Sequence, residues 1–206
     1  MIKEMVSKEL IDMLGKSVSG GYILANVVTK SHDFLDSPVG KETKPYFRRA
    51  AIEFLAYTNA KNVNNLESEF RPNKTRNYHH IELYFNKRLI ITINHLACIN
   101  GIKQELPRDA EFRKELARKN PLQEHLFPNF PEKYIEGDKI HSTLIHEGRD
   151  FPERVALIVQ NPNGNKILDT LPIKVSRHLD NSDVNLIEGL SPEFLEFVKK
   201  AVGNIK

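Results

Sequence analysis

The stretch YHHIELYFNKRLIITINHL, residues 78–96, decides the fold that the sequence predicts. Its first half, Tyr78–Phe85, alternates between side chains of opposite character with a period close to two. Its second half, Leu89–Leu96, is rich in β-branched residues, and only the polar Asn86-Lys87-Arg88 separates the two halves. Two such runs around a three-residue break are typical of a β-hairpin.

The register of this hairpin brings polar side chains together. Pairing Phe85 with Leu89 would place His79 opposite His95, with Cβ atoms within about 5.5 Å. Two imidazoles would need a third ligand from elsewhere to hold a divalent metal, and hydrogen-bonding or surface histidines are more common, so we expect neither a metal site nor a cofactor. His80 and Glu82 share one face of the first strand because their spacing is two.

Helical periodicity dominates the first 60 residues. Apolar side chains recur at spacings of three and four over Ile2–Leu14 and suggest a second helix over Tyr22–Leu35. We expect Gly20-Gly21 to separate these helices, since paired glycines favour a turn. A third helix is predicted over Lys44–Ala60, and the asparagine-rich residues 61–77 predict a polar connector.

The rest of the chain predicts further strands and two helices. A short charged helix is expected over Asp109–Lys119 with Asp109 as its N-cap, and a strand over Ile140–His146. Two runs, Arg154–Gln160 and Lys166–Ile173, flank an Asn-Gly turn and predict a second hairpin. A last helix is expected over Pro192–Val202, with Ser191 as its cap.

These elements predict an α+β fold in which amino-terminal helices pack on an antiparallel sheet of about five strands, with a carboxy-terminal helix. We expect a single domain over residues 1–206, with a helical part at 1–60, a mainly β part at 78–175 and the terminal helix at 191–203. No glycine-rich phosphate loop follows any predicted strand, which gives Rossmann and P-loop folds no support.

Composition excludes several classes of protein. The 206 residues include one cysteine, Cys98, which rules out an internal disulfide framework and a cysteine-based zinc finger. The longest apolar runs are far shorter than the ~20 residues of a membrane span, and no apolar signal-peptide core is visible near Met1. We therefore expect a cytoplasmic protein without membrane contact.

The net charge of +3 is unevenly distributed. Residues 61–125 carry twelve basic and eight acidic side chains, whereas residues 126–206 carry ten and twelve. The excess could attract phosphate, and a solvated loop beside a hairpin turn is the simpler interpretation. The candidate nucleic-acid contacts are Arg71, Lys74, Arg76, Lys87 and Arg88.

The same region could support metal-independent cleavage of RNA. Such a ribonuclease could use a histidine as general base, with arginine, lysine or tyrosine against the phosphate charge. Candidate catalytic residues are Tyr78, His79, His80 and His95, although nothing in their spacing requires them to converge.

A proline-containing stretch, residues 123–134, predicts an extended surface segment. It carries the aromatic residues Phe127, Phe130 and Tyr134, and aromatic side chains are typical anchors of protein interfaces. They are candidate partner-binding residues, and their burial in the core is an equally good interpretation.

The order of features over Pro45–Ile173 resembles a group of small uncharacterised bacterial proteins. The resemblance rests on the basic-plus-apolar start of the second hairpin strand, a following segment with a glutamine and prolines, and two later strands. These stand here as Lys87–Ile93, Leu122–Pro131, Ser142–Ile145 and Arg154–Val159. Such proteins are often encoded beside an antitoxin-like regulator that combines a helix-turn-helix with a metallopeptidase-like domain.

The resemblance implies the toxin of a bacterial toxin–antitoxin pair, which inhibits growth and is neutralised by an antitoxin-like partner. Two alternatives remain at this point. One is a nucleic-acid-binding protein or metal-independent ribonuclease that uses the basic hairpin, and the other is a non-enzymatic interaction module of a phage or mobile element.

Overall fold

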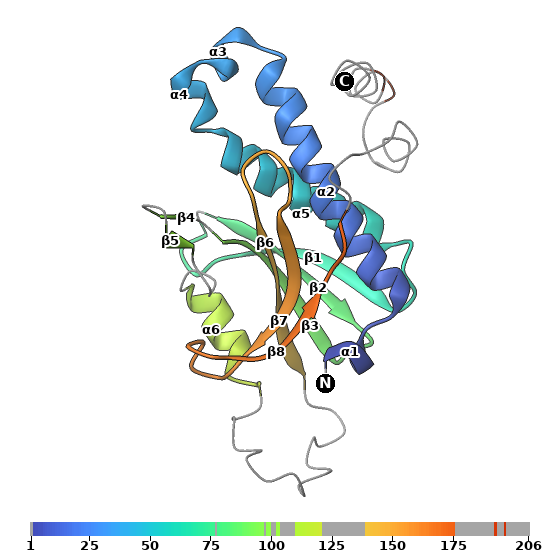
Figure 1. The fold of residues 1–206 in the computed structure, drawn as a ribbon. Coiled ribbons are helices and arrows are strands. Elements are labelled where there is room, and N and C mark those ends of the chain that lie inside the picture. Colours follow the sequence, from blue (N-terminus) through green and yellow to red (C-terminus); the bar gives the residue numbers. More distant parts are fainter. Residues whose placement is uncertain are drawn as a thin grey trace, which may run out of the picture.

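The fold is α+β, with amino-terminal helices and a mixed six-stranded sheet (Figure 1). The computed structural model describes residues 2–76, 78–96, 98–99, 102–103, 110–120 and 139–175, together with the single positions Pro192 and Glu196. The sheet order is β1-β2-β3-β6-β7-β8. Its strands are β1 Leu66–Pro72, β2 His79–Phe85, β3 Leu89–His95, β6 Ile140–Glu147, β7 Arg154–Gln160 and β8 Ile167–Pro172, and a separate pair is β4 Cys98–Ile99 with β5 Ile102–Lys103.

Helices α2 and α5 lie against each other and cover one face of the sheet (Figure 1). The helices are α1 Ile2–Met5, α2 Lys8–Lys30, α3 Asp33–Asp36, α4 Pro38–Lys41, α5 Lys44–Ala60 and α6 Glu111–Ala117. Ser7 caps α2 by accepting a hydrogen bond from the Leu10 N–H. Among the described residues, no helix combines the length and the apolar character that a bilayer crossing requires.

The expected break at Gly20-Gly21 is wrong, because α2 runs through both glycines as one helix of 23 residues. The two glycines face α5 at the closest point of contact. A Cβ atom on Gly21 would lie 2.2 Å from Cγ1 of Ile52 and 2.9 Å from its Cα. Here glycine serves close helix packing and not a turn.

The sheet differs from the prediction in two ways. Residues 66–72, expected as part of a connector, form the edge strand β1, which pairs antiparallel with β2 along its whole length. Strands β3 and β6 pair in parallel, so the sheet is mixed and not fully antiparallel. A parallel pair needs a long crossover, and that crossover carries α6.

The predicted hairpins are confirmed. Strands β2 and β3 pair antiparallel with Phe85 opposite Leu89, and β7 pairs with β8 across the Asn-Gly turn. Helix α6 is also confirmed, but it begins at Glu111 with Ala110 as its N-cap, so the expected cap at Asp109 is wrong. The predicted terminal helix lies outside the described residues, apart from Pro192 and Glu196, both of which are helical.

Side-chain alternation separates the two faces of the sheet. Ile81, Leu83 and Phe85 of β2 belong to one apolar core with Leu14 of α2 and Ile52 of α5. The intervening side chains, His80, Glu82 and Tyr84, lie on the opposite face, where Phe112 of α6 stacks on His80. The face of the sheet opposite α2 and α5 therefore carries polar side chains, which α6 covers in part.

Candidate nucleic-acid interface

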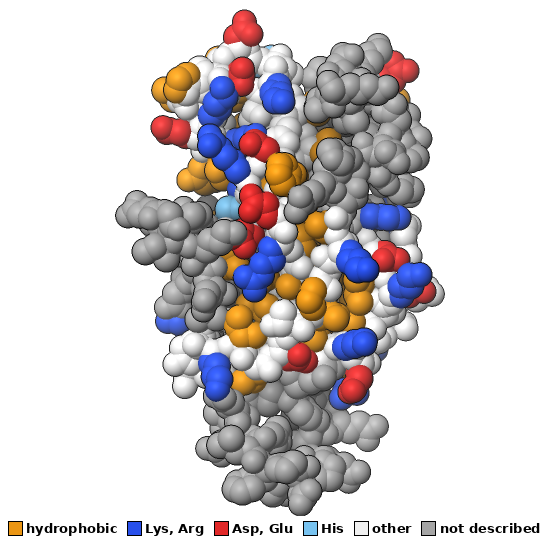
Figure 2. Space-filling view, in the orientation of Figure 1, with side chains coloured by type: hydrophobic (Ala, Val, Ile, Leu, Met, Phe, Trp, Pro, Cys, Tyr) orange, Lys and Arg blue, Asp and Glu red, His pale blue; other side chains and the backbone are white. Residues whose placement is uncertain are grey.

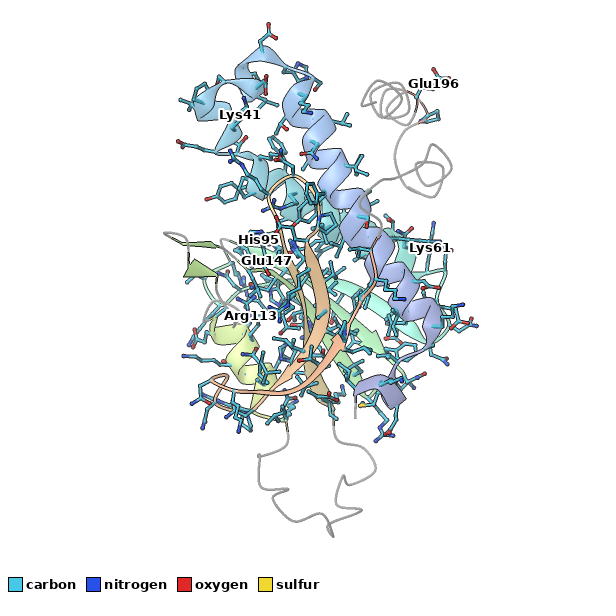
Figure 3. All side chains as sticks on the ribbon, in the orientation of Figure 1. Lys41, Lys61, His95, Arg113, Glu147 and Glu196 are labelled. Carbon is cyan, nitrogen blue, oxygen red and sulfur yellow. The ribbon has the colours of Figure 1, made fainter. Side chains whose placement is uncertain are left out.

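A pocket of about 1060 Å³ opens on this second face, between strands β1–β3 and helix α6. Figure 3 shows Arg113 on α6 beside the sheet. Its charged and aromatic lining includes Arg71, Lys74, Tyr78, His80, Glu82, Tyr84, Phe112, Arg113, Lys119 and Lys139. They come from four separate parts of the chain, so only the folded protein contains this site.

A histidine–carboxylate pair lies in the wall of the pocket. The His80 Nε2 atom is 3.0 Å from Oε1 of Glu82, and both side chains are buried. The Tyr84 hydroxyl donates to the other carboxylate oxygen. Burial raises the pKa of Glu82, but the hydrogen bonds from His80 and Tyr84 and the charge of Arg71 outweigh it, so the pKa lies below its usual value.

An ionised Glu82 determines how His80 is protonated. A carboxylate only accepts hydrogen bonds, so Nε2 of His80 carries the proton that lies between them. The Nδ1 atom of His80 is buried and has no hydrogen-bond partner in the described structure. Burial and the bond to Glu82 also raise the pKa of Tyr84, which therefore remains a neutral donor.

Aromatic rings surround the imidazole of His80. The Phe112 ring lies 3.7 Å from it, centroid to centroid, and is nearly parallel at 19°. Tyr78 lies 6.3 Å away at 22° and has the Arg49 guanidinium 3.7 Å above its own ring. Flat apolar faces beside a polar wall are the surfaces on which nucleobases stack.

Cationic side chains outnumber acidic ones in the lining. The cations are Arg71, Lys74, Arg113, Lys119 and Lys139, and the acids are Glu82, Glu111 and Glu115. The Arg71 Nε atom lies 3.5 Å from the Glu82 carboxylate, and Lys139 lies 6.0 Å from the centre of the Tyr84 ring. Five positive against three negative charges favour an anionic ligand.

The pocket collects some of the residues predicted from the sequence. Arg71, Lys74, Tyr78 and His80 all line it. Arg76, Lys87 and Arg88 do not: Arg76 is in the turn before β2, as is Lys74, and the other two are in the turn after it. His79 is exposed, and its carbonyl accepts a hydrogen bond from Arg49.

Sequence reasoning missed Arg113, Lys119 and Lys139 as site residues. Arg113 and Lys119 come from α6 and the turn after it, and Lys139 directly precedes β6. No local pattern marks them, since they meet β2 only through the parallel pairing of β3 with β6. The shared face of His80 and Glu82 was the one local signal for the core of the site.

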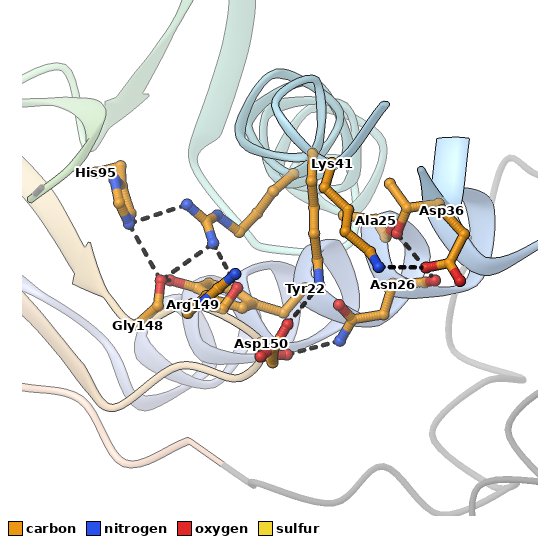
Figure 4. Close-up of polar contacts among 12 residues, drawn as sticks. Tyr22, Ala25, Asn26, Asp36, Lys41, His95, Gly148, Arg149 and Asp150 are labelled. Carbon is orange, nitrogen blue, oxygen red and sulfur yellow. Dashed lines mark hydrogen bonds and ion pairs between the residues drawn. The ribbon is translucent and has the colours of Figure 1, made fainter. Parts of the chain in front are cut away.

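His95 does not line this pocket, although its neighbour Asn94 does. The His95 side chain lies on the other face of the sheet, beside Arg48 of α5 and Gly148 (Figure 4). The expected pairing of His79 with His95 is wrong, because the β2–β3 ladder covers only Leu83–Phe85 and Leu89–Ile91. His79 pairs only with Pro72 of β1, and His95 only with His146 of β6.

Buried Arg48 joins α5 to the segment that follows β6. Its Nη1 atom donates to the carbonyls of Gly148 and Arg149 at 3.0 and 2.8 Å, and its Nη2 atom lies 3.0 Å from Nε2 of His95. Nε2 of His95 therefore accepts this bond, since a guanidinium only donates. We assign this cluster to stability, because the Arg48 guanidinium is already held by two backbone carbonyls and His95; a pocket of about 670 Å³ lies beside it.

The candidate partner-binding residues Phe127, Phe130 and Tyr134 lie outside the described residues.

Comparison of the chain with models of protein families, with curated proteins and with solved structures gives no match in any of the three. Of the described side chains, no group of three or more His, Cys, Asp or Glu is placed to hold a metal ion.

Proposed function

We propose that the protein binds single-stranded RNA in the pocket between β1–β3 and α6. The observation that carries the proposal is the combination, in one pocket, of aromatic rings with an excess of cations. Sequence-tolerant binding of single strands uses this combination, because every base has a face that can stack and every linkage has a phosphate. A duplex would hide the base faces that Tyr78 and Tyr84 could contact.

Two double substitutions test whether RNA binds in this pocket or at the hairpin turn. We expect Arg71→Ala with Lys139→Ala to weaken RNA binding and to lower the salt dependence by about two units of slope, about one for each lost phosphate contact. Lys87→Ala with Arg88→Ala removes the same charge outside the pocket and should leave the salt slope within about half a unit. Fluorescence anisotropy with a labelled 12-mer across salt concentrations measures both.

Two results would overturn the proposal. If the unmodified protein shows no salt-sensitive binding of RNA at low ionic strength, the pocket is not a nucleic-acid site. If the hairpin pair carries the whole salt dependence, binding occurs on the turn and not in the pocket.

We also propose that the protein acts in cells as a growth-inhibiting toxin neutralised by a protein partner, as the resemblance implies. One observation favours a protein partner. Phe34, Val39 and Tyr46, from the α3–α5 end, are 70%, 75% and 74% exposed, and Figure 2 shows hydrophobic side chains among charged ones at that end. Exposed apolar clusters are typical of interaction sites.

Induction in cells with and without the neighbouring gene tests this role. We expect growth arrest on induction alone and its relief when the neighbour is expressed together with the protein. Absence of arrest at every expression level would remove the toxin role and leave the proposed RNA binding to be decided by the anisotropy experiment.

A further inference from the structure

We infer that the pocket cleaves the RNA it binds, with His80 as general base and Glu82 as the positioning residue that orients it. The inference rests on the proposed RNA binding, and it adds a reaction and a substrate class: RNA with a free 2′-hydroxyl next to the scissile phosphate.

The first support is the chemical state of His80. Its Nε2–H is directed to the Glu82 carboxylate at 3.0 Å, which leaves the lone pair on Nδ1 to accept a proton. That atom is buried and meets no donor in the described structure. A carboxylate on the opposite nitrogen stabilises the imidazolium that forms when the base takes its proton, as a general base requires.

Other buried histidines show what an imidazole held for structure looks like. His141 sits 2.9 Å from the Thr92 hydroxyl, and burial with the nearby Arg113 charge lowers its pKa to about 3. His146 faces the Tyr22 hydroxyl at 3.1 Å, and burial lowers its pKa as well. Both remain neutral and poorly basic, whereas His80 has a carboxylate beside it and lines a pocket.

The second support is the surrounding charge. In-line attack places extra negative charge on the phosphate oxygens in the transition state, and cations already present in the site stabilise it. Arg71, Arg113 and Lys139 line the same pocket as His80. The neutral hydroxyl of Tyr84 holds Glu82 from its other side and so keeps the pair oriented.

The step balances without any further reactant. The 2′-hydroxyl loses its proton to Nδ1 of His80 as its oxygen forms a bond to phosphorus. The bond from phosphorus to the 5′-oxygen breaks, and that oxygen takes a proton from water. The products end in a 2′,3′-cyclic phosphate and a 5′-hydroxyl, and His80 returns its proton to solvent.

Access to the base depends on Phe112. His80 is 3% exposed, and the Phe112 ring lies flat against it. Phe112 itself is only partly buried, and cleavage requires its side chain to turn toward solvent when RNA binds. A nucleobase can then take the stacking position that the phenyl ring leaves.

The experiment compares three labelled 12-mers of one sequence, as RNA, 2′-O-methyl RNA and DNA, with the full chain in excess EDTA. We expect the RNA to be cut to fragments that end in a 2′,3′-cyclic phosphate by mass spectrometry. The 2′-O-methyl strand should bind with similar affinity and stay intact, because its 2′-oxygen has no proton to give.

Three variants test the assigned roles. His80→Gln should lower the cleavage rate by about 100-fold or more, the usual effect of losing a general base, while His79→Gln on the neighbouring exposed residue should not change it. Glu82→Gln should slow cleavage less than His80→Gln does, because it removes the carboxylate that orients the imidazole and leaves the base itself in place.

The outcomes separate the two proposals. RNA that is bound but not cut, or equal cutting of the 2′-O-methyl strand, overturns the cleavage inference and leaves RNA binding in place. A full rate in folded His80→Gln overturns it as well. If no strand binds at all, the proposed function fails too. Should His80→Gln not fold, the three strands still decide with the unmodified protein.

Discussion

The contact between α2 and α5 predicts different outcomes for two neighbouring substitutions, Gly20→Ala and Gly21→Ala. Both replace a helical glycine, so each gains about 1 kcal/mol of helix propensity. They differ in what the new Cβ atom meets. On Gly20 it would lie 2.8 Å from Cδ1 of Leu55, the far end of a flexible side chain. On Gly21 it would lie 2.2 Å from Cγ1 of Ile52 and 2.8 Å from its backbone nitrogen.

The size of the difference follows from how each clash can relax. Leu55 can change rotamer at a cost of about 0.5–1.5 kcal/mol, which roughly cancels the gain at Gly20. Backbone atoms of α5 cannot move without shifting the helix, and overpacking of this kind costs about 1–3 kcal/mol. We therefore expect Gly21→Ala to be about 2 kcal/mol less stable than Gly20→Ala, or about 4–8 °C in Tm.

Urea unfolding followed by far-UV circular dichroism measures both variants under one set of conditions. The unmodified protein is the reference, and equal m-values confirm that the two transitions can be compared. A midpoint for Gly21→Ala equal to or above that of Gly20→Ala would refute the close packing of α2 on α5.

Two further predictions concern buried polar groups. The pKa of His141 falls from 6.5 unfolded to about 3 folded, so the unfolded chain binds more protons between these values and the free energy of unfolding decreases as pH falls below 6.5. At pH 5 the contribution of His141 to the free energy of unfolding is about 2 kcal/mol smaller than at pH 7. Urea midpoints at pH 7 and pH 5 measure this loss. An unchanged midpoint would show that His141 is not buried as a neutral group. Arg48→Met removes the donors to the Gly148 and Arg149 carbonyls and should lower the free energy of unfolding by about 2–4 kcal/mol. The control Arg154→Met, at an exposed position, should lower it by less than about 0.5 kcal/mol. Equal losses of stability in both variants would contradict a stabilising role of the Arg48 hydrogen bonds.

Local patterns were enough to predict several elements of this fold. The β2–β3 hairpin and its register, α5, and the turn between β7 and β8 follow from alternation, helical spacing and an Asn-Gly pair. The shared face of His80 and Glu82 follows from the same alternation. Each of these features depends on residues close together in the chain, where side-chain periodicity and turn chemistry act directly.

Contacts between distant residues decided the rest. Gly20-Gly21 remains helical because Ile52 and Leu55 of α5 pack against it, and residues 66–72 form a strand because β2 offers an unpaired edge. The parallel pairing of β3 with β6 brings Lys139 and Arg113 to the pocket with His80. No local signal encodes these outcomes, because their free energy comes from surfaces that meet only after the chain has folded.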